Sequence, residues 1–105
     1  MAMVFRRGDL VRDTRQPAGE RPRLALVLSH DELNTVNTGL IVAWLAWTSL
    51  GNSLEVLLGD DPDEGVVLVD FLDRLPTRHV ELRGAVTPRV IREVQAILDV
   101  ALLQH

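Results

Sequence analysis

Short apolar segments joined by short connections of turn-forming residues most constrain the fold of this chain. Five or six segments of strand length precede residue 85; they are 8–14, 24–29, 40–48, 54–58, 66–70 and 78–84. Connections too short for a crossover helix favour antiparallel neighbours. The pattern therefore predicts a mainly β protein, a small twisted sheet or open barrel of five to six short antiparallel strands.

The end of the chain has a different period. Thr87 is a candidate N-cap, and Pro88 suits the first helical position. Apolar residues then recur at helical spacing; they are Val90, Ile91, Val94, Ile97, Leu98, Ala101 and Leu102. This predicts a C-terminal amphipathic helix over 87–103, packed on the sheet. With 105 residues, we expect a single domain over 1–105.

Composition narrows the chemistry and the compartment. There is no cysteine, which excludes disulfides and thiolate catalysis. No apolar run reaches the roughly 18 residues of a membrane span, and the charge at the N-terminus follows a short apolar stretch, the reverse of a signal peptide. We therefore expect a cytoplasmic protein with no membrane segment.

Charge is distributed unevenly along the chain. The net charge of −4 argues against a general nucleic-acid binder. Residues 1–25, however, hold six arginines against three acidic residues. All 11 basic residues are arginine, for which genomic base composition is the simpler explanation. The alternative is functional, since an arginine fork binds phosphate through two parallel hydrogen bonds.

Polar residues stand at the ends of three predicted strands. Arg21 and Arg23 precede the second segment and share parity, so both would project from the same face. Thr48 ends the third segment, and Asp70 ends the segment 66–70. An arginine, a hydroxyl and a carboxylate brought together would form a site. The alternative is that each is a solvated end of its strand.

Metal and cofactor motifs are weak in this sequence. The acidic loop 59–65 lacks a third Asp or Asn before its glycine and a Glu at the twelfth position, which a calcium loop needs. His30, Asp31 and Glu32 are adjacent, so their side chains diverge from one turn. No glycine-rich phosphate loop or zinc spacing occurs. We expect no metal and no cofactor.

Four stretches follow one another in a characteristic order; they are RRGDLV, ERPRLALVLSHDELN, LIVAWLAWTS and GVVLVD. In order and spacing they resemble the MazF/PemK family of toxin endoribonucleases, over nearly the whole chain. The resemblance implies an SH3-like open barrel with a C-terminal helix, assembled as a homodimer. It also implies sequence-selective, metal-independent cleavage of single-stranded RNA, silenced by a cognate antitoxin with an acidic, disordered tail.

The resemblance also assigns catalytic residues. The family pairs an arginine at the start of the second strand with a threonine closing the third, which corresponds to Thr48. Matching the Arg-Pro dipeptide selects Arg21, whereas counting back without a gap from Ser29 selects Arg23. We favour Arg23, because strand register is a physical constraint and a dipeptide match is not. Asp70 matches an aspartate that some members use as general base.

The chemistry of RNA cleavage suits these residue types. An arginine fork stabilises the negative charge that develops on the phosphate oxygens, and a hydroxyl donates one further hydrogen bond. The pKa of arginine is too high for an easy proton shuttle, which makes Asp70 the better candidate for the base. Arg15, Arg21 and Ser49 are expected to contact the RNA beside this catalytic group.

The chain also departs from the family pattern. Phe71 stands where the family has glutamine after the aspartate, and Leu24 stands where it has proline after the arginine. These departures keep a second function open: a non-catalytic or gyrase-poison-like binding module on the same barrel that binds its antitoxin. Incubation with RNA distinguishes a nuclease from a binding module.

Overall fold

The structure, a computed structural model, describes residues 4–16, 22–31, 39–49, 51, 54–60 and 64–103. Within these ranges six antiparallel strands form one sheet, in the order β4-β5-β3-β2-β1-β6. The strands are β1 (Asp9–Asp13), β2 (Leu24–Val27), β3 (Gly39–Ala46), β4 (Glu55–Leu57), β5 (Val66–Pro76) and β6 (Val80–Ala85). A 3₁₀ turn, η2 (Thr77–His79), precedes β6, and the helix α2 spans Pro88–Leu103.

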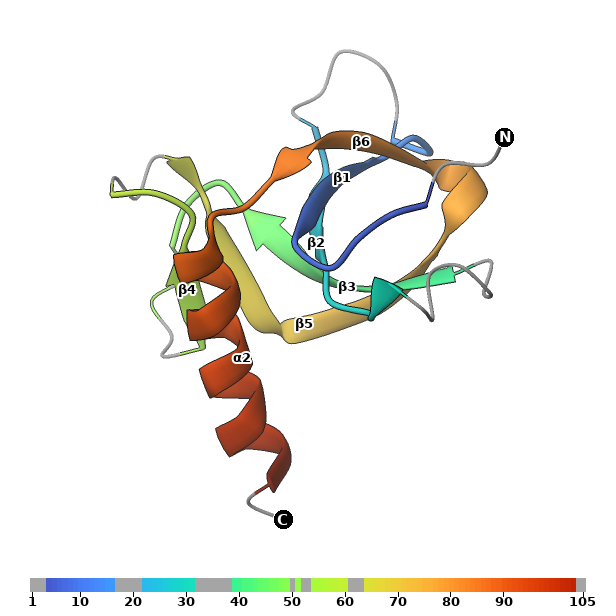
Figure 1. Ribbon diagram of the computed structural model, residues 1–105. Coiled ribbons are helices and arrows are strands. Elements are labelled where there is room, and N and C mark those ends of the chain that lie inside the picture. Colours follow the sequence, from blue (N-terminus) through green and yellow to red (C-terminus); the bar gives the residue numbers. More distant parts are fainter. Residues whose placement is uncertain are drawn as a thin grey trace.

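The sheet is strongly curled. In Figure 1, β6 passes over β1 while β3 and β5 run along the opposite side, and η2 joins the end of β5 to the start of β6. A core of buried side chains fills the interior; it consists of Phe5, Val11, Ala25, Val27, Leu40, Val42 and Leu75. The predicted mainly β architecture, a small open antiparallel sheet with a C-terminal helix, is confirmed.

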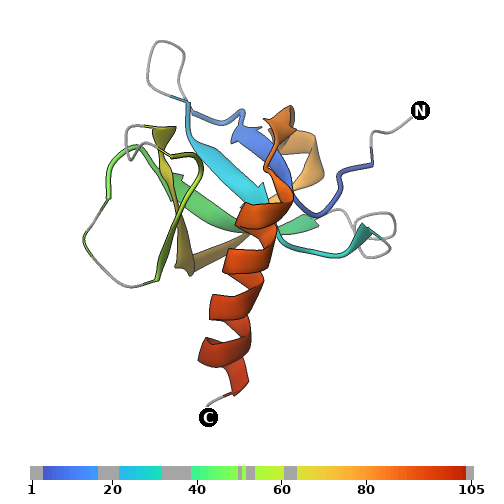
Figure 2. The same cartoon turned by 60° about the vertical axis from the view of Figure 1, so that its left-hand side comes forward.

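A second core lies on the outer face of the sheet, under α2. Residues alternate between faces along a strand, so Leu26 and Ala43 point away from the barrel interior. The buried members are Leu26, Ala43, Val56, Val67, Val69, Val90 and Val94, the last two from α2. The predicted helix and its apolar face are therefore confirmed. Figure 2 shows that the C-terminal half of α2 extends beyond the sheet.

Two strand ends predicted from the sequence were wrong. The segment 66–70 does not end at Asp70, because β5 continues to Pro76. Four residues of β5, 68–71, lie opposite the single residue Trp44 of β3. Such a bulge bends a strand and interrupts its alternation, which hides its continuation from a pattern-based prediction. In the same way β3 ends at Ala46, two residues before Thr48.

The Arg-Gly-Asp motif at the start of the chain has a structural part. Gly8 adopts a φ of 97°, a conformation that favours glycine. Its N–H donates to the carbonyl of Val27, and its own carbonyl accepts from the N–H of Val86, both at 2.9 Å. The guanidinium of Arg7 hydrogen-bonds Gln95 of α2. The motif thus fastens the start of β1 to β2 and to the helix.

Candidate arginine site

Arg23 lies at the rim of the barrel, immediately before β2. Its carbonyl accepts a hydrogen bond from the N–H of Asp13 at 2.9 Å, and its own N–H donates to Oε1 of Gln16 at 2.6 Å. Alternation along β2 places its side chain on the same face as Ala25, which belongs to the barrel core. The backbone therefore directs the Arg23 side chain across the mouth of the barrel.

The Arg23 guanidinium lies over the ring of Trp44. Its central carbon is 3.9 Å from the ring centroid, well within the range of a cation–π interaction. The indole Nε1 of Trp44 donates to Oδ2 of Asp73 at 3.3 Å, which fixes the ring in turn. Because the Arg23 side chain is still 55% exposed, its N–H groups remain accessible to a ligand.

Asp13 is a buried carboxylate beside this arginine. Its side chain is only 2% exposed, yet it is surrounded by positive charge. Arg15 donates from Nε to Oδ1 at 3.0 Å and from Nη2 to Oδ2 at 3.1 Å, and Nη1 of Arg23 is 3.9 Å from Oδ2. The hydrogen bonds from Arg15 hold the pKa of Asp13 below its ordinary value of 3.8, against the opposing effect of burial. Asp13 is therefore ionised at neutral pH.

The two arginines around Asp13 differ in how far they are engaged. Arg15 binds both carboxylate oxygens through its side chain, and this contact raises the pKa of Arg15. Arg23 approaches the same carboxylate at only one nitrogen and at a longer distance. Arg23 is therefore the arginine with more donors left for a phosphate, whereas Arg15 serves mainly to hold Asp13.

Thr48 lies at the same edge of the sheet as Arg23. The strands β2 and β3 are antiparallel, with Ala25 opposite Trp44, so the start of β2 neighbours the end of β3. Thr48 follows that end by two residues and is exposed. The topology thus brings the backbone of Arg23 and the backbone of Thr48 to one rim of the sheet.

The residues expected to contact RNA are placed differently. The Ser49 hydroxyl donates to Oε1 of Glu55 at 2.5 Å and accepts from the N–H of Gly51 at 3.1 Å, so it helps to close the turn before β4. Arg15 is paired with Asp13, and Arg21 lies outside the described residues. A direct role for any of the three in RNA binding stays a prediction.

Asp70 lies in the bulge of β5 and is exposed. Among the described residues it forms no ion pair, and the carboxylates that meet the arginine site are Asp13 and Asp73. Sequence reasoning missed both, together with the role of Trp44. One signal was available for Asp13, because it shares parity with the core residue Val11 and so faces the barrel interior.

The described part of the chain shows neither a metal-binding cluster nor a membrane-spanning helix. No group of three or more His, Asp or Glu side chains is placed there to hold a metal ion. The helices in the same ranges include none with the length and apolar character needed to cross a bilayer.

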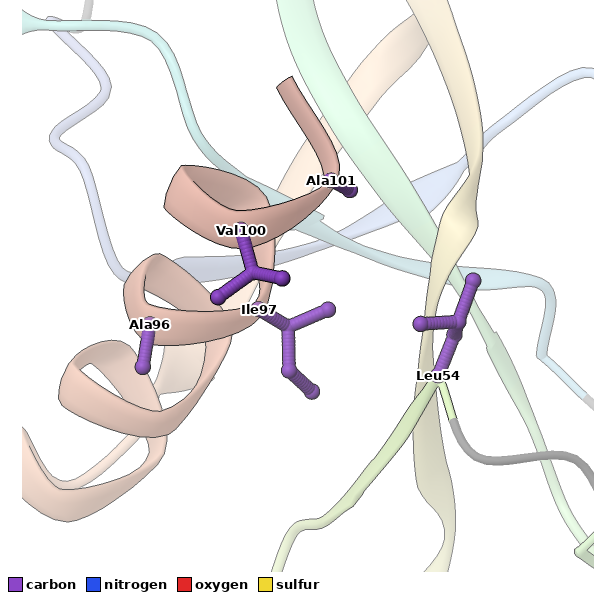
Figure 3. Close-up of a pocket in the computed structure, with 5 residues that line it drawn as sticks. All are labelled: Leu54, Ala96, Ile97, Val100 and Ala101. Carbon is purple, nitrogen blue, oxygen red and sulfur yellow. The ribbon is translucent and has the colours of Figure 1, made fainter. Parts of the chain in front are cut away.

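An apolar groove lies between α2 and Leu54, the residue that precedes β4. It has a volume of about 550 Å³ and is lined by Leu54, Ala96, Ile97, Val100 and Ala101. In Figure 3, Leu54 faces Ile97 and Val100 across the open space. Val100, which lines this groove, is 56% exposed.

The curled six-stranded sheet with its C-terminal helix is similar in fold to solved structures of MazF toxins. MazF from Deinococcus radiodurans aligns with a TM-score of 0.79 and 28% identity, over 98% of this chain and 100% of that one. The MazE–MazF complex of the same organism (Form-II) aligns with a TM-score of 0.81 and 28% identity, over 99% of this chain and 100% of that one.

A more distant structure shares the same fold. An endoribonuclease from a mycobacterial species, solved in complex with its cognate antitoxin, gives a TM-score of 0.75 and 23% identity, over 94% of this chain and 93% of that one. No protein-family model and no curated protein matches this chain. The similarity to known proteins therefore rests on solved structures, which confirm the resemblance to MazF/PemK toxins in fold.

Proposed function

We propose that this chain is the toxin of a type II toxin–antitoxin system, a metal-independent endoribonuclease that cuts single-stranded RNA at a short sequence motif. The observation that carries the proposal is the exposed Arg23 guanidinium, seated on Trp44 at the start of β2. Of the two arginines that the family resemblance allows at the catalytic position, Arg21 and Arg23, we favour Arg23 on strand register. The likeness to MazF supports the same conclusion.

The proposed reaction is an internal transfer. The 2′-oxygen of the RNA attacks the adjacent phosphorus and loses its proton to a base, while the bond to the 5′-oxygen breaks and that oxygen takes up a proton. Arg23 stabilises the charge that develops on the non-bridging oxygens, and Thr48 donates a further hydrogen bond. The products are a 2′,3′-cyclic phosphate and a 5′-hydroxyl.

Asp70 is the better candidate for the base of the two acids on β5. Both oxygens of Asp73 already accept hydrogen bonds, Oδ2 from Trp44 at 3.3 Å and Oδ1 from the N–H of Arg74 at 2.7 Å. Asp70 is exposed and forms no ion pair with another described residue, so its carboxylate is accessible to RNA. This assignment agrees with the aspartate that some family members use.

We expect the purified protein to cleave single-stranded RNA in the presence of EDTA. The guanidinium and hydroxyl donors replace the charge stabilisation that a metal would otherwise provide. Gel analysis with end-group chemistry would detect the cyclic phosphate and the 5′-hydroxyl. Intact RNA after prolonged incubation at high protein concentration would contradict the nuclease and favour the binding module.

The binding module has one structural observation in its favour. The buried carboxylate of Asp13 lies 3.9 Å from Nη1 of Arg23, where it competes with an incoming phosphate. Phe71, in place of the family's glutamine, removes one polar contact for a base. Under this alternative the chain binds its antitoxin and leaves RNA intact.

The proposed partners are single-stranded RNA, an antitoxin and a second copy of the chain. The antitoxin would place an acidic, disordered segment on the barrel rim around Arg23, in competition with RNA. That segment would become ordered as it binds. Because the attraction is between charges at an exposed surface, its affinity should fall as the salt concentration rises.

A homodimer would cover apolar surface that one copy leaves exposed. The register between β3 and β5 places Ile41 and Leu72 on the same face of the sheet that α2 covers elsewhere. Both residues are nevertheless exposed. Val100 is a further exposed apolar residue, on α2. Exposed apolar patches of this kind mark interfaces, and a two-fold dimer is the commonest way to close one.

We expect light scattering to show a dimer at micromolar concentration, and Val100→Asp to shift the population toward monomer. The substitution puts a charge into the apolar groove without entering the buried core. Arg92→Asp is the matched control, since it introduces the same side chain at an exposed position of α2 that is not part of that groove. A monomeric wild-type chain would contradict the dimer.

A further inference from the structure

We infer that Asp13 is a positioning residue that fixes the orientation of the Arg23 guanidinium. The kinetic consequence of this inference rests on the proposed nuclease function, whereas its structural consequence does not. Asp13 reaches the proposed chemistry only through Arg23, at 3.9 Å, and so it is not itself a catalytic residue.

The contact with Trp44 alone does not fix the orientation of the Arg23 guanidinium. The Trp44 ring holds the guanidinium carbon of Arg23 at 3.9 Å from its centroid, but the cation can still rotate above the ring. A contact at one edge removes this freedom. Oδ2 of Asp13, 3.9 Å from Nη1, supplies that contact at one nitrogen, and the Arg23 side chain stays 55% exposed.

Asp13 is well suited to act as a fixed point. Its side chain is almost fully buried, and Oδ1 accepts from both the backbone N–H and Nε of Arg15, each at 3.0 Å. Nη2 of Arg15 binds the second oxygen at 3.1 Å. A carboxylate with this many donors has little freedom to rotate. Arg15 therefore holds Asp13, and Asp13 in turn holds Arg23.

The choice of a carboxylate at this position is informative. Val11, two residues earlier on the same face, is fully buried, so the barrel interior accepts apolar side chains there. A negative charge at the rim weakens the attraction for RNA phosphates, whereas an apolar residue would not. The carboxylate thus reduces affinity and, by our inference, improves the orientation of the group that stabilises the transition state.

Because the carboxylate lowers RNA affinity but improves the orientation of Arg23, Asp13→Asn should change the cleavage rate and the RNA affinity in opposite directions. Single-turnover cleavage should slow by about 10- to 100-fold, because misplacing a charge-stabilising donor has effects of this order. RNA binding should tighten by about two- to threefold, because one negative charge near the phosphate is gone. A rate that falls only in proportion to the folded fraction, or an affinity that falls with the rate, would overturn the inference.

Glu81→Gln is the matched control. Glu81 also lies close to two arginines, Arg83 at 3.6 Å and Arg12 at 3.9 Å, but on the exposed edge strand β6. Removing its charge tests whether any lost carboxylate slows cleavage. We expect the cleavage rate of this variant to stay within about twofold of wild type, as exposed ion pairs contribute little. A slowing as large as that of Asp13→Asn would overturn the inference.

A second readout is independent of RNA. The indole N–H of Trp44 gives an NMR signal that senses the cation above the ring, and Trp47→Phe identifies which of the two tryptophan signals it is. In Asp13→Asn this signal should move toward its position in Arg23→Ala. An unchanged Trp44 signal would overturn the inference. If the wild type cleaves no RNA, the nuclease proposal fails while this test still decides the role of Asp13.

The double variant Asp13→Ala/Arg15→Ala covers the case in which Asp13→Asn does not fold. It removes the buried carboxylate together with its main partner, so that neither charge is left without the other. The same displacement of the Trp44 signal and the same slowing of cleavage are expected. A double variant with a wild-type Trp44 signal and a wild-type cleavage rate would refute the positioning role.

Discussion

Replacing Arg23 by alanine is expected to slow RNA cleavage by about 10²- to 10³-fold, the usual effect of deleting one preorganised donor to a developing oxyanion. The fold should survive, because the Arg23 side chain is more than half exposed and lies on Trp44 rather than within the core. Single-turnover rates at saturating protein, together with circular dichroism, would measure both effects. Thr48→Ala should slow cleavage less, since it removes a neutral donor.

Arg83→Ala is the control for this experiment. Arg83 is similarly exposed, lies on β6 and approaches one carboxylate, that of Glu81, at 3.6 Å. The Arg83→Ala variant should cleave RNA at the wild-type rate. Full activity in Arg23→Ala combined with loss of activity in Arg21→Ala would show that the catalytic arginine is the one in the Arg-Pro dipeptide.

The local parts of the fold are predictable from the sequence because they depend on patterns within a few residues. The 3.6-residue period from Val90 to Leu98 predicts α2, and the apolar segments predict the positions of the strands. The continuation of β5 beyond Asp70 is not predictable in this way. It depends on a bulge opposite Trp44, which is a property of the pairing between two strands and leaves no local pattern.

In the candidate site, too, some residues are assigned from sequence motifs and others are found only in the folded structure. The assignments of Arg23 and Thr48 come from the family motifs in the sequence and stay proposals. Asp13, Trp44 and Asp73 come from three different strands and meet only when the sheet curls and the register is set. A pair such as Asp13 and Arg15, two residues apart, reads in sequence as ordinary surface charge. Apart from the parity that Asp13 shares with the core residue Val11, only burial of the carboxylate shows that it has a different role.

Val94→Asp should have the largest effect on stability. Val94 is 1% exposed and packs with Val90 in the apolar cluster between α2 and the sheet. An aspartate there has no partner, and an uncompensated buried charge destabilises by about 3 kcal/mol or more. For a domain of this size that lowers the Tm by at least about 12 °C. Thermal unfolding followed by far-UV circular dichroism measures the loss.

Val100→Asp makes the same substitution six residues further along the same helix. Because Val100 is exposed, its Tm at protein concentrations where the wild type is monomeric should stay within about 4 °C, corresponding to less than about 1 kcal/mol. At higher concentrations it should melt below the wild type, because a dimer adds stability by mass action. Equal melting of Val94→Asp and Val100→Asp in the monomer range would contradict the packing of α2 through Val94. A concentration-independent Tm for the wild type would contradict the dimer.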